Sequence, residues 1–328
     1  MPKTINKANR VIEGLKREPN SLSAIRESED LVNNDEVWSR VCLKAYSEYF
    51  KQEKNKRKHE ERDPNIGCLT RDQIQDLINV NNLLVNYALS ISSHSTYQEV
   101  LTIKQLLLNP IANERAIFEE ISEITMEVRM RALNKIGRFS KLEPFFEFYK
   151  IIESATISYY RGNYMGAYLT LVPTIEGIIS RWIGFDGTGE KPSFEQLRKF
   201  FKNGHLRNPC PGNVLFYDIW YKTCDKILNE HYYKPTTSGE SYNNFNRHLA
   251  AHLLNNSIFA TKENCIRLFL LLDLMSEIFM YENYIDDMRF YVKDSEIELE
   301  INLYNLALQQ QVFSPEKLLL NSNQGFIS

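Results

Sequence analysis

Apolar residues recur three and four positions apart along most of the chain, which is the repeat of an amphipathic α-helix. This spacing predicts helices over residues 35–58, 70–91, 114–133, 145–160, 164–183, 193–202, 214–232 and 261–281. The 13 glycines and 11 prolines fall mainly between these stretches. We therefore expect an all-α protein, a multi-helix bundle in which short turns join the helices.

Several local signals sharpen this pattern. Thr70 and Gln73 have the spacing of a capping box, which predicts the start of a helix. The Arg161-Gly162-Asn163 segment predicts the turn of a helical hairpin, and Pro173 marks a candidate kink in its second helix. The helix over 261–281 is apolar on nearly every side, so we expect it at the centre of a bundle.

A break near Gly137 to Pro144 separates a first helical region from a second, more apolar one. We place a domain boundary there. The expected organisation is an N-terminal helical region over 1–140, a helical domain over 141–290, and a C-terminal helix and tail over 291–328.

Composition narrows the class of protein. The chain has 328 residues, of which 43% are hydrophobic and 25% charged, enough for one or two domains with real cores. No window approaches eighteen uncharged apolar residues, so no membrane span or membrane partner is expected. The first 20 residues lack the apolar region of a signal peptide, and we expect a cytoplasmic protein. The net charge of −3 neither demands nor forbids a nucleic-acid partner.

No cofactor is expected. The five cysteines are widely separated and contain no C-x-x-C pair, which argues against a zinc ribbon or a disulfide framework. The glycine-rich segment 184–192 does not have the order of a Walker loop, because its lysine precedes a proline and its neighbours are predicted helices. Isolated glycine-rich turns of this kind are common between helices.

The segment from Asn246 to His252, Asn-Arg-His-Leu-Ala-Ala-His, is the one stretch whose residues indicate chemistry. On a helix, His248 and His252 share a face, whereas Arg247 and His252 lie about 140° apart, so spacing alone does not prove that they converge. Two histidines at this spacing can bind zinc, but neither a glutamate base nor a third ligand is signalled nearby, and no metal is expected.

Arginine and histidine together match the needs of metal-independent RNA cleavage. That reaction requires groups that take a proton from the 2′-hydroxyl and protonate the leaving 5′ oxygen, and positive charge that stabilises the phosphorane. Arg247 supplies a fixed cation with forked donors, and the imidazoles titrate close to neutral pH. DNA lacks the 2′-hydroxyl and cannot react by this route.

The segment Arg247 to His252 resembles the R-x4-H motif of HEPN-domain proteins, with His248 in the place of the polar residue that commonly follows the arginine. The segments Tyr160 to Ala167 and Leu171 to Gly177 resemble the early helices of bacterial members, and Thr261-Lys-Glu-Asn with its leucine-rich helix resembles their end. The resemblance covers roughly residues 145 to 285. One position departs from related bacterial sequences: Leu253 stands where glycine often follows the second histidine.

The resemblance implies a four- or five-helix bundle that forms a homodimer and joins two R-x4-H motifs in one cleft, where RNA is cut without a metal. Members often serve in antiviral defence, abortive infection, toxin systems or RNA processing. By this resemblance Arg247 holds the phosphate and His252 is the acid or base. His248 and Asn246 orient them, and Glu176 is a supporting acid.

Other interpretations stay open. A HEPN-like fold can bind RNA or protein without cutting, which makes a non-catalytic interaction module the rival hypothesis. In the catalytic hypothesis the N-terminal helices sense a signal or bind a regulatory protein. The spacing of Arg198 and His205 fits a looser form of the motif, but it spans a turn and is interpreted as accidental. Tyr217, Trp220 and Tyr221 are interpreted as packing residues, because aromatic stripes on helices usually pack.

Overall fold

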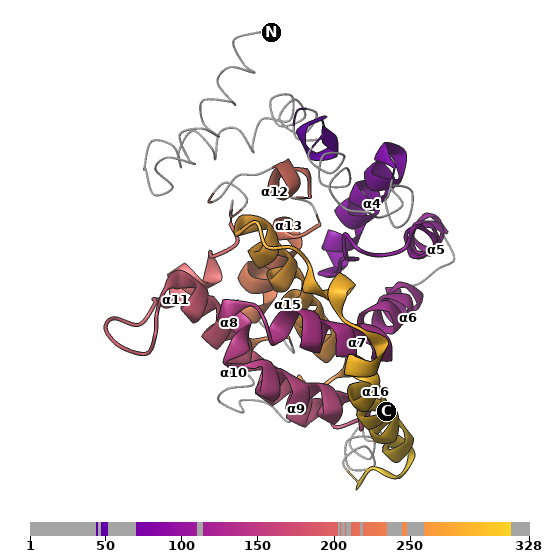
Figure 1. The fold of residues 1–328 in the computed structure, drawn as a ribbon, viewed down its shortest axis with the longest axis vertical. Coiled ribbons are helices and arrows are strands. Elements are labelled where there is room, and N and C mark those ends of the chain that lie inside the picture. Colours follow the sequence, from indigo (N-terminus) through magenta and orange to yellow (C-terminus); the bar gives the residue numbers. More distant parts are fainter. Residues whose placement is uncertain are drawn as a thin grey trace. The chain divides into compact units, whose positions relative to one another are not determined.

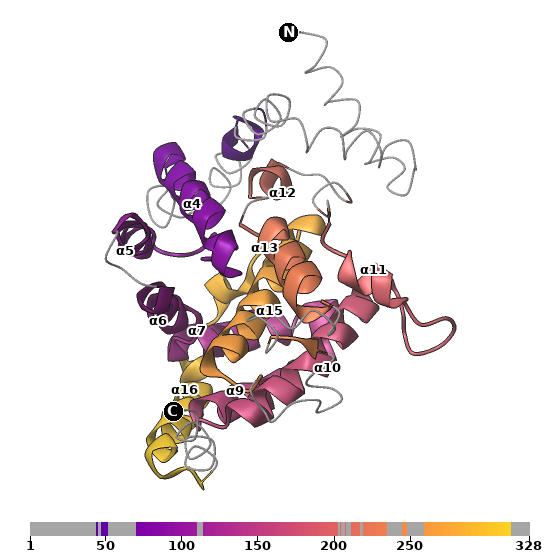
Figure 2. The same ribbon diagram turned by 180° about the vertical axis from the view of Figure 1, so that it is seen from behind.

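The computed structural model describes residues 44, 47–51, 70–109, 114–202, 204, 207, 211–216, 219–234, 245–247 and 259–315. Every regular element in these ranges is a helix, which confirms the predicted all-α class (Figures 1 and 2). The longer α-helices are α4 (Arg71–Leu84), α5 (Tyr97–Leu108), α6 (Glu114–Thr125), α9 (Tyr149–Tyr160), α10 (Tyr164–Ile183), α15 (Lys262–Glu282) and α16 (Asp294–Gln310). The shorter ones are α7 (Val128–Asn134), α8 (Glu143–Phe146), α11 (Phe194–Arg198), α12 (Pro211–Leu215) and α13 (Tyr221–Lys226).

The capping box that begins α4 is present as predicted. The backbone N–H of Thr70 donates to Gln73 Oε1 at 2.8 Å, and the Gln73 N–H donates to the Thr70 hydroxyl at 3.3 Å. The helix is shorter than predicted, because a 3-10 turn, η1 (Val85–Tyr87), follows it and Ala88 adopts a left-handed conformation with φ 55°. The helix predicted over 35–58 is described only at residues 44 and 47–51, which are helical.

Two predicted helices are interrupted. The stretch 114–133 forms α6 and α7, because the carboxylate of Glu127 accepts the backbone N–H groups of Arg129 and Met130 and caps a new helix. The stretch 214–232 is divided among α12, α13 and a π-helix, η4 (Ile227–Tyr232). Apolar spacing does not reveal such breaks, because the periodicity resumes after each of them.

The predicted hairpin is formed by α9 and α10, which pack along each other (Figure 1). Gly162 takes a φ of 79° at the turn, and the Asn163 side chain accepts the Gly166 N–H at 2.8 Å to cap α10. Farther along α10, a Cβ on Gly177 would lie 2.6 Å from the Phe148 ring. Only glycine permits this approach, so the helix position beside Glu176 is closely defined.

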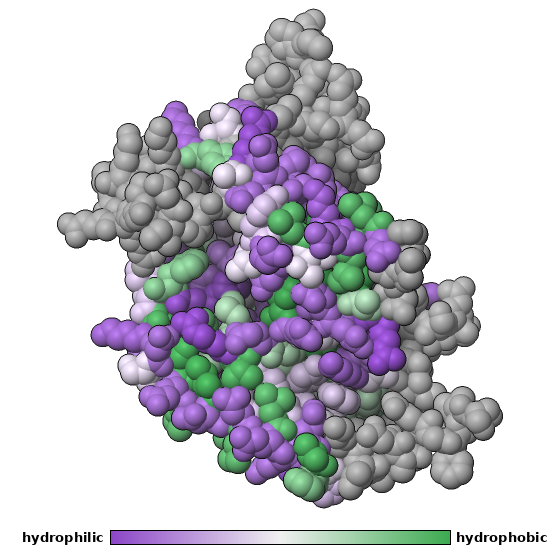
Figure 3. Space-filling view, turned by 90° about the vertical axis from the view of Figure 1, so that its right-hand side faces the viewer, coloured by the Kyte–Doolittle hydropathy of each residue, from purple (hydrophilic) through white to green (hydrophobic). Residues whose placement is uncertain are grey.

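Helix α15 is buried on every face from residue 264 to residue 280, as its apolar sequence predicts. The Thr261 hydroxyl accepts the Asn264 N–H at 3.1 Å at its start. Among the helices that the structure describes, none combines the length and the apolarity required to cross a bilayer. Figure 3 shows one face of the molecule, on which apolar side chains are interspersed among hydrophilic ones.

The described residues fall into two compact units, neither of which is continuous in sequence. Unit 1 comprises the described parts of 1–110, 201–224 and 277–285, and unit 2 those of 111–200, 225–276 and 286–328. This division differs from the boundary expected at residue 140. Helices α6 and α7 precede residue 140 but belong with the later helices, since side chains of α7 and of the π-helix η2 (Lys135–Phe139) pair with partners beyond it.

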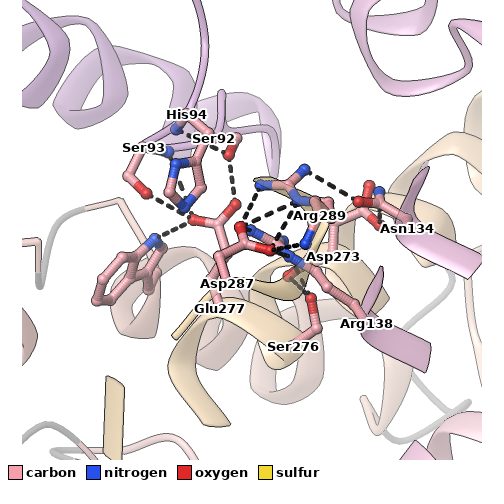
Figure 4. A network of polar contacts seen from close by, with 11 residues as sticks. Ser92, Ser93, His94, Asn134, Arg138, Asp273, Ser276, Glu277, Asp287 and Arg289 are labelled. Atoms are coloured by element: carbon pink, nitrogen blue, oxygen red, sulfur yellow. Dashed lines mark hydrogen bonds and ion pairs between the residues drawn. The ribbon is translucent and has the colours of Figure 1, made fainter. Parts of the chain in front are cut away.

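In unit 1 the carboxylate of Glu277 is fully buried and serves as a structural acceptor (Figure 4). It accepts hydrogen bonds from the hydroxyl of Ser92, from the hydroxyl of Ser93 at 2.9 Å and from the indole N–H of Trp220 at 2.8 Å. These donors compensate the loss of water around the charge. Trp220 and Tyr221 are fully buried, which confirms their interpretation as packing residues; Tyr217 lies outside the described residues.

Unit 2 contains a buried to half-buried charge network of four cations and four carboxylates. Arg131 pairs with Asp273, Lys135 with Glu153 at 3.0 Å and Glu300 at 3.1 Å, and Arg138 and Arg289 each with Asp287 at 2.7 Å. Figure 4 shows part of this network, in which Asn134 also bonds Asp273 and Arg289. Because Arg138 is fully buried and Arg131 is 3% exposed, their charges depend on these partners.

Removing one carboxylate from this network should destabilise the protein strongly. We expect Asp273→Ala to lower the free energy of unfolding by about 3–5 kcal/mol, because it leaves Arg131 buried without its counter-charge. The control is Glu119→Ala, which removes an exposed pair with Arg115 and should cost at most about 0.5 kcal/mol. Urea denaturation measures both; similar small losses in the two variants would contradict the importance of the network.

Candidate functional site

Arg247 and Glu176 form an ion pair in unit 2 that includes one hydrogen bond. Arg247 Nε lies 2.5 Å from Glu176 Oε1, and Arg247 Nη2 donates to Glu176 Oε2 at 3.1 Å. Both side chains remain partly open to solvent, with exposed fractions of 24% and 17%. The fold thus brings together two of the candidate site residues that were predicted from the sequence.

Two tyrosines at the end of η4 fix the surroundings of Glu176 on α10. The hydroxyl of Tyr233 donates to Glu176 Oε1 at 3.2 Å, and the hydroxyl of Tyr232 donates to the carbonyl of Val172 at 2.6 Å. Burial, reinforced by the Glu176 charge, raises the pKa of Tyr233, so its hydroxyl stays protonated and available as a donor. The carboxylate therefore has a fixed position before any ligand binds.

The guanidinium of Arg247 keeps an edge that can bind an anion. Burial acts to lower the pKa of Arg247, but the hydrogen bond and charge of Glu176 outweigh it and raise the pKa, so the side chain is a permanent cation. Glu176 lies against Nε and accepts its hydrogen bond from Nη2. Within the described residues, no hydrogen bond involves Nη1 of Arg247. The Nη1 and Nη2 edge has the forked geometry that suits two phosphate oxygens.

Asn246 is buried, and its side chain contacts backbone. Its amide Nδ2 donates to the carbonyl of Lys234 and, at 3.4 Å, to that of His231. These bonds attach the residue before Arg247 to the end of η4, the same segment that holds Glu176 through Tyr233. Asn246 therefore helps to position the arginine backbone.

His248 and His252 lie outside the described residues, so their roles remain predictions.

In the parts of the chain that the structure covers, no group of three or more His, Cys, Asp or Glu side chains is arranged to hold a metal ion. Cys224 and Cys265 are buried thiols, and burial raises the pKa of Cys265. Arg198, the arginine of the looser motif, donates to Asn229 at 2.9 Å.

Besides Tyr233, two neighbours of the site were not predicted from the sequence. Phe194, the first residue of α11, is 49% exposed; the Arg247 Cζ lies 6.0 Å from its ring centroid and the Tyr233 ring packs edge-on against it at 4.7 Å. His231, in the π-helix η4, lies 6.1 Å from the Phe245 ring. Neither belongs to a sequence motif, although π-helical turns are frequent at functional sites.

No family model, curated protein or solved structure matches this chain. The chemistry of the site therefore depends on its own residues: a permanent cation whose Nη1 makes no hydrogen bond within the described residues, an acid that orients it, and an exposed aromatic ring.

His231 should make stability depend on pH. Burial first, and then the nearby Arg267, lower the pKa of His231 to about 4, below the ordinary value of about 6.5 expected in the unfolded chain. The contribution of neutral His231 to the free energy of unfolding is therefore complete above pH 6.5. It is lost as the pH falls to about 4, by at most about 1.4 kcal/mol per pH unit. Chemical denaturation of wild type and His231→Gln checks this: the variant should lose less stability across that window. Parallel curves from pH 7 to 4 would contradict it.

Proposed function

We propose that this chain is a metal-independent endoribonuclease whose region 141–290 is a HEPN-like domain. The observation that carries the proposal is the geometry of Arg247: Glu176 holds it through Nη2, while Nη1 makes no hydrogen bond within the described residues and is left to bind an anion. This arginine is also the first residue of the R-x4-H segment that ends at His252. A positioned cation of this kind stabilises the negative charge that develops on a phosphate in its transition state.

In the proposed reaction the 2′-hydroxyl of RNA attacks the adjacent phosphorus. A general base removes the 2′ proton, the bond to the 5′ oxygen breaks, and a general acid protonates that oxygen, leaving a 2′,3′-cyclic phosphate and a 5′-hydroxyl. Arg247 binds the phosphate oxygens, and His252 carries a proton. Two copies of the chain in a homodimer supply two such histidines. His248 orients this machinery, and Asn246 positions Arg247 through its backbone contacts.

The biological setting of the proposal follows the HEPN resemblance. We propose a cytoplasmic enzyme of antiviral defence, abortive infection or a toxin system, with region 1–140 sensing a signal or binding a regulatory protein. RNA is its substrate.

The second candidate is a non-catalytic helical module that binds RNA or another protein. One observation favours it: Glu176 already neutralises Arg247, and a permanent ion pair of this kind can serve structure alone. In this case replacing Arg247 and His252 leaves the biological phenotype intact, whereas changes on an exposed apolar face abolish it.

Cleavage of total RNA in EDTA tests the proposed function. The full chain should cut RNA, and Arg247→Ala and His252→Ala should each lower the rate by about 100-fold or more, because each removes transition-state charge stabilisation or proton transfer. Arg198→Ala is the matched control, since this arginine belongs to the looser motif and bonds Asn229. It should cut as the wild type does.

Two results would overturn the proposed ribonuclease activity. One is the absence of cleavage by every dimeric preparation, with dimers verified by sedimentation. The other is equal cleavage by wild type, Arg247→Ala and His252→Ala.

A further inference from the structure

Phe194 is held rigidly although half of its surface is open to solvent. Ser193 forms a capping box with Gln196 at the start of α11, with bonds of 2.7 and 3.3 Å. Leu197 on the same short helix is 4% exposed, which anchors α11 to unit 2, whereas Phe194 is 49% exposed. Because burying an aromatic ring is favourable, a ligand that covers this exposed ring gains binding energy.

The ring of Phe194 is also connected to the ion pair. It packs edge-to-face with Tyr233, at 4.7 Å between centroids and 78° between planes. Tyr233 in turn bonds Glu176, which holds Arg247. One set of contacts therefore fixes both the exposed ring and the guanidinium, whose Cζ is 6.0 Å from the ring centroid.

This combination matches the two ends of a nucleotide. The phosphate of a nucleotide binds a forked cation, and its base stacks on an aromatic face. The Arg247 Cζ lies over the Phe194 ring, 6.0 Å from its centroid, so a base that stacks on the other face of the ring has its neighbouring phosphate close to the guanidinium. Bases in a duplex are stacked on each other and do not reach a side chain at the protein surface, whereas unpaired bases do.

We propose that Phe194 stacks one unpaired base of single-stranded RNA whose neighbouring phosphate binds the Arg247 fork. This inference rests on the proposed function and makes it more specific, because it names single-stranded RNA as the substrate class. Stacking tolerates any base, so the site selects unpaired strands and not a sequence.

Binding of an RNA that cannot be cut tests the proposal. The probe is a short single-stranded oligonucleotide with 2′-O-methyl groups, and its dissociation constant for the full chain is measured by fluorescence anisotropy at one fixed salt concentration. We expect Phe194→Ala to weaken binding about tenfold, within the factor of about 5 to 150 that stacking of one base contributes. Phe194→Trp should restore binding, and the same strand in a duplex should bind wild type more weakly.

Phe146→Ala is the matched control. Phe146 also belongs to unit 2, is 58% exposed and contacts one tyrosine, Tyr149, at 6.0 Å, but it lies on α8, outside the site. Its replacement should leave binding unchanged. Thermal unfolding should show that Phe194→Ala folds, since an exposed ring contributes little to the core.

An abasic scan distinguishes stacking from an indirect effect. Removing the base at successive positions should weaken binding to wild type at one position about as much as Phe194→Ala does, and should have no further effect on that variant. Equal binding by wild type and Phe194→Ala, no measurable binding, or abasic losses that are the same in both proteins would overturn the proposal.

The two proposals fail separately. If the abasic scan shows that an RNA base and the Phe194 ring are coupled in binding, but no RNA is cleaved in EDTA, the stacking proposal holds and the proposed ribonuclease activity is wrong. If RNA is cleaved and the cleavage depends on Arg247, but the base and the Phe194 ring are not coupled, the proposed ribonuclease activity holds and the proposed role of Phe194 is wrong.

Discussion

The need to neutralise charge inside unit 2 constrains its helices more than any single apolar contact. Arg131, Lys135 and Arg138 follow one another at helical spacing on α7 and η2, and their carboxylate partners come from α9, α15, α16 and the segment after α15. A charge buried without its partner costs several kcal/mol, so these elements have to meet in one arrangement. Helix α9 joins the network through the half-buried pair of Lys135 and Glu153, and α10, which carries Glu176, packs along α9.

In the candidate site, too, a cation is neutralised by a carboxylate, but this pair lies at the surface of unit 2. Glu176 neutralises Arg247, but both remain partly exposed, and Nη1 of the guanidinium makes no hydrogen bond within the described residues. The pair is stable without a ligand and still able to bind an anion. Tyr233 contacts both Glu176 and Phe194, so the acid, the cation and the exposed ring are ordered together. This coupling connects the proposed phosphate site to the proposed base-stacking site.

The sequence predicted the local features well. The cap at Thr70, the turn at Gly162 and the burial of α15 were all predicted, because each depends on neighbouring residues or on composition. The breaks between α6 and α7 and between α12 and α13 were not predicted, since apolar spacing continues across them. Of the site, Arg247 and Glu176 were nominated by resemblance, whereas Phe194 and Tyr233 carried no signal.

By itself, the sequence determined the helical class and the ends of several helices, because hydrogen bonds of caps and turns join residues a few positions apart. Only the tertiary structure decided that Glu176 pairs with Arg247, that Asn246 bonds the end of η4, and that Phe194 is exposed. Those contacts join residues far apart in the chain. Which of the many arginines and aromatics meet depends on how whole helices pack, and that information is not contained in any local pattern.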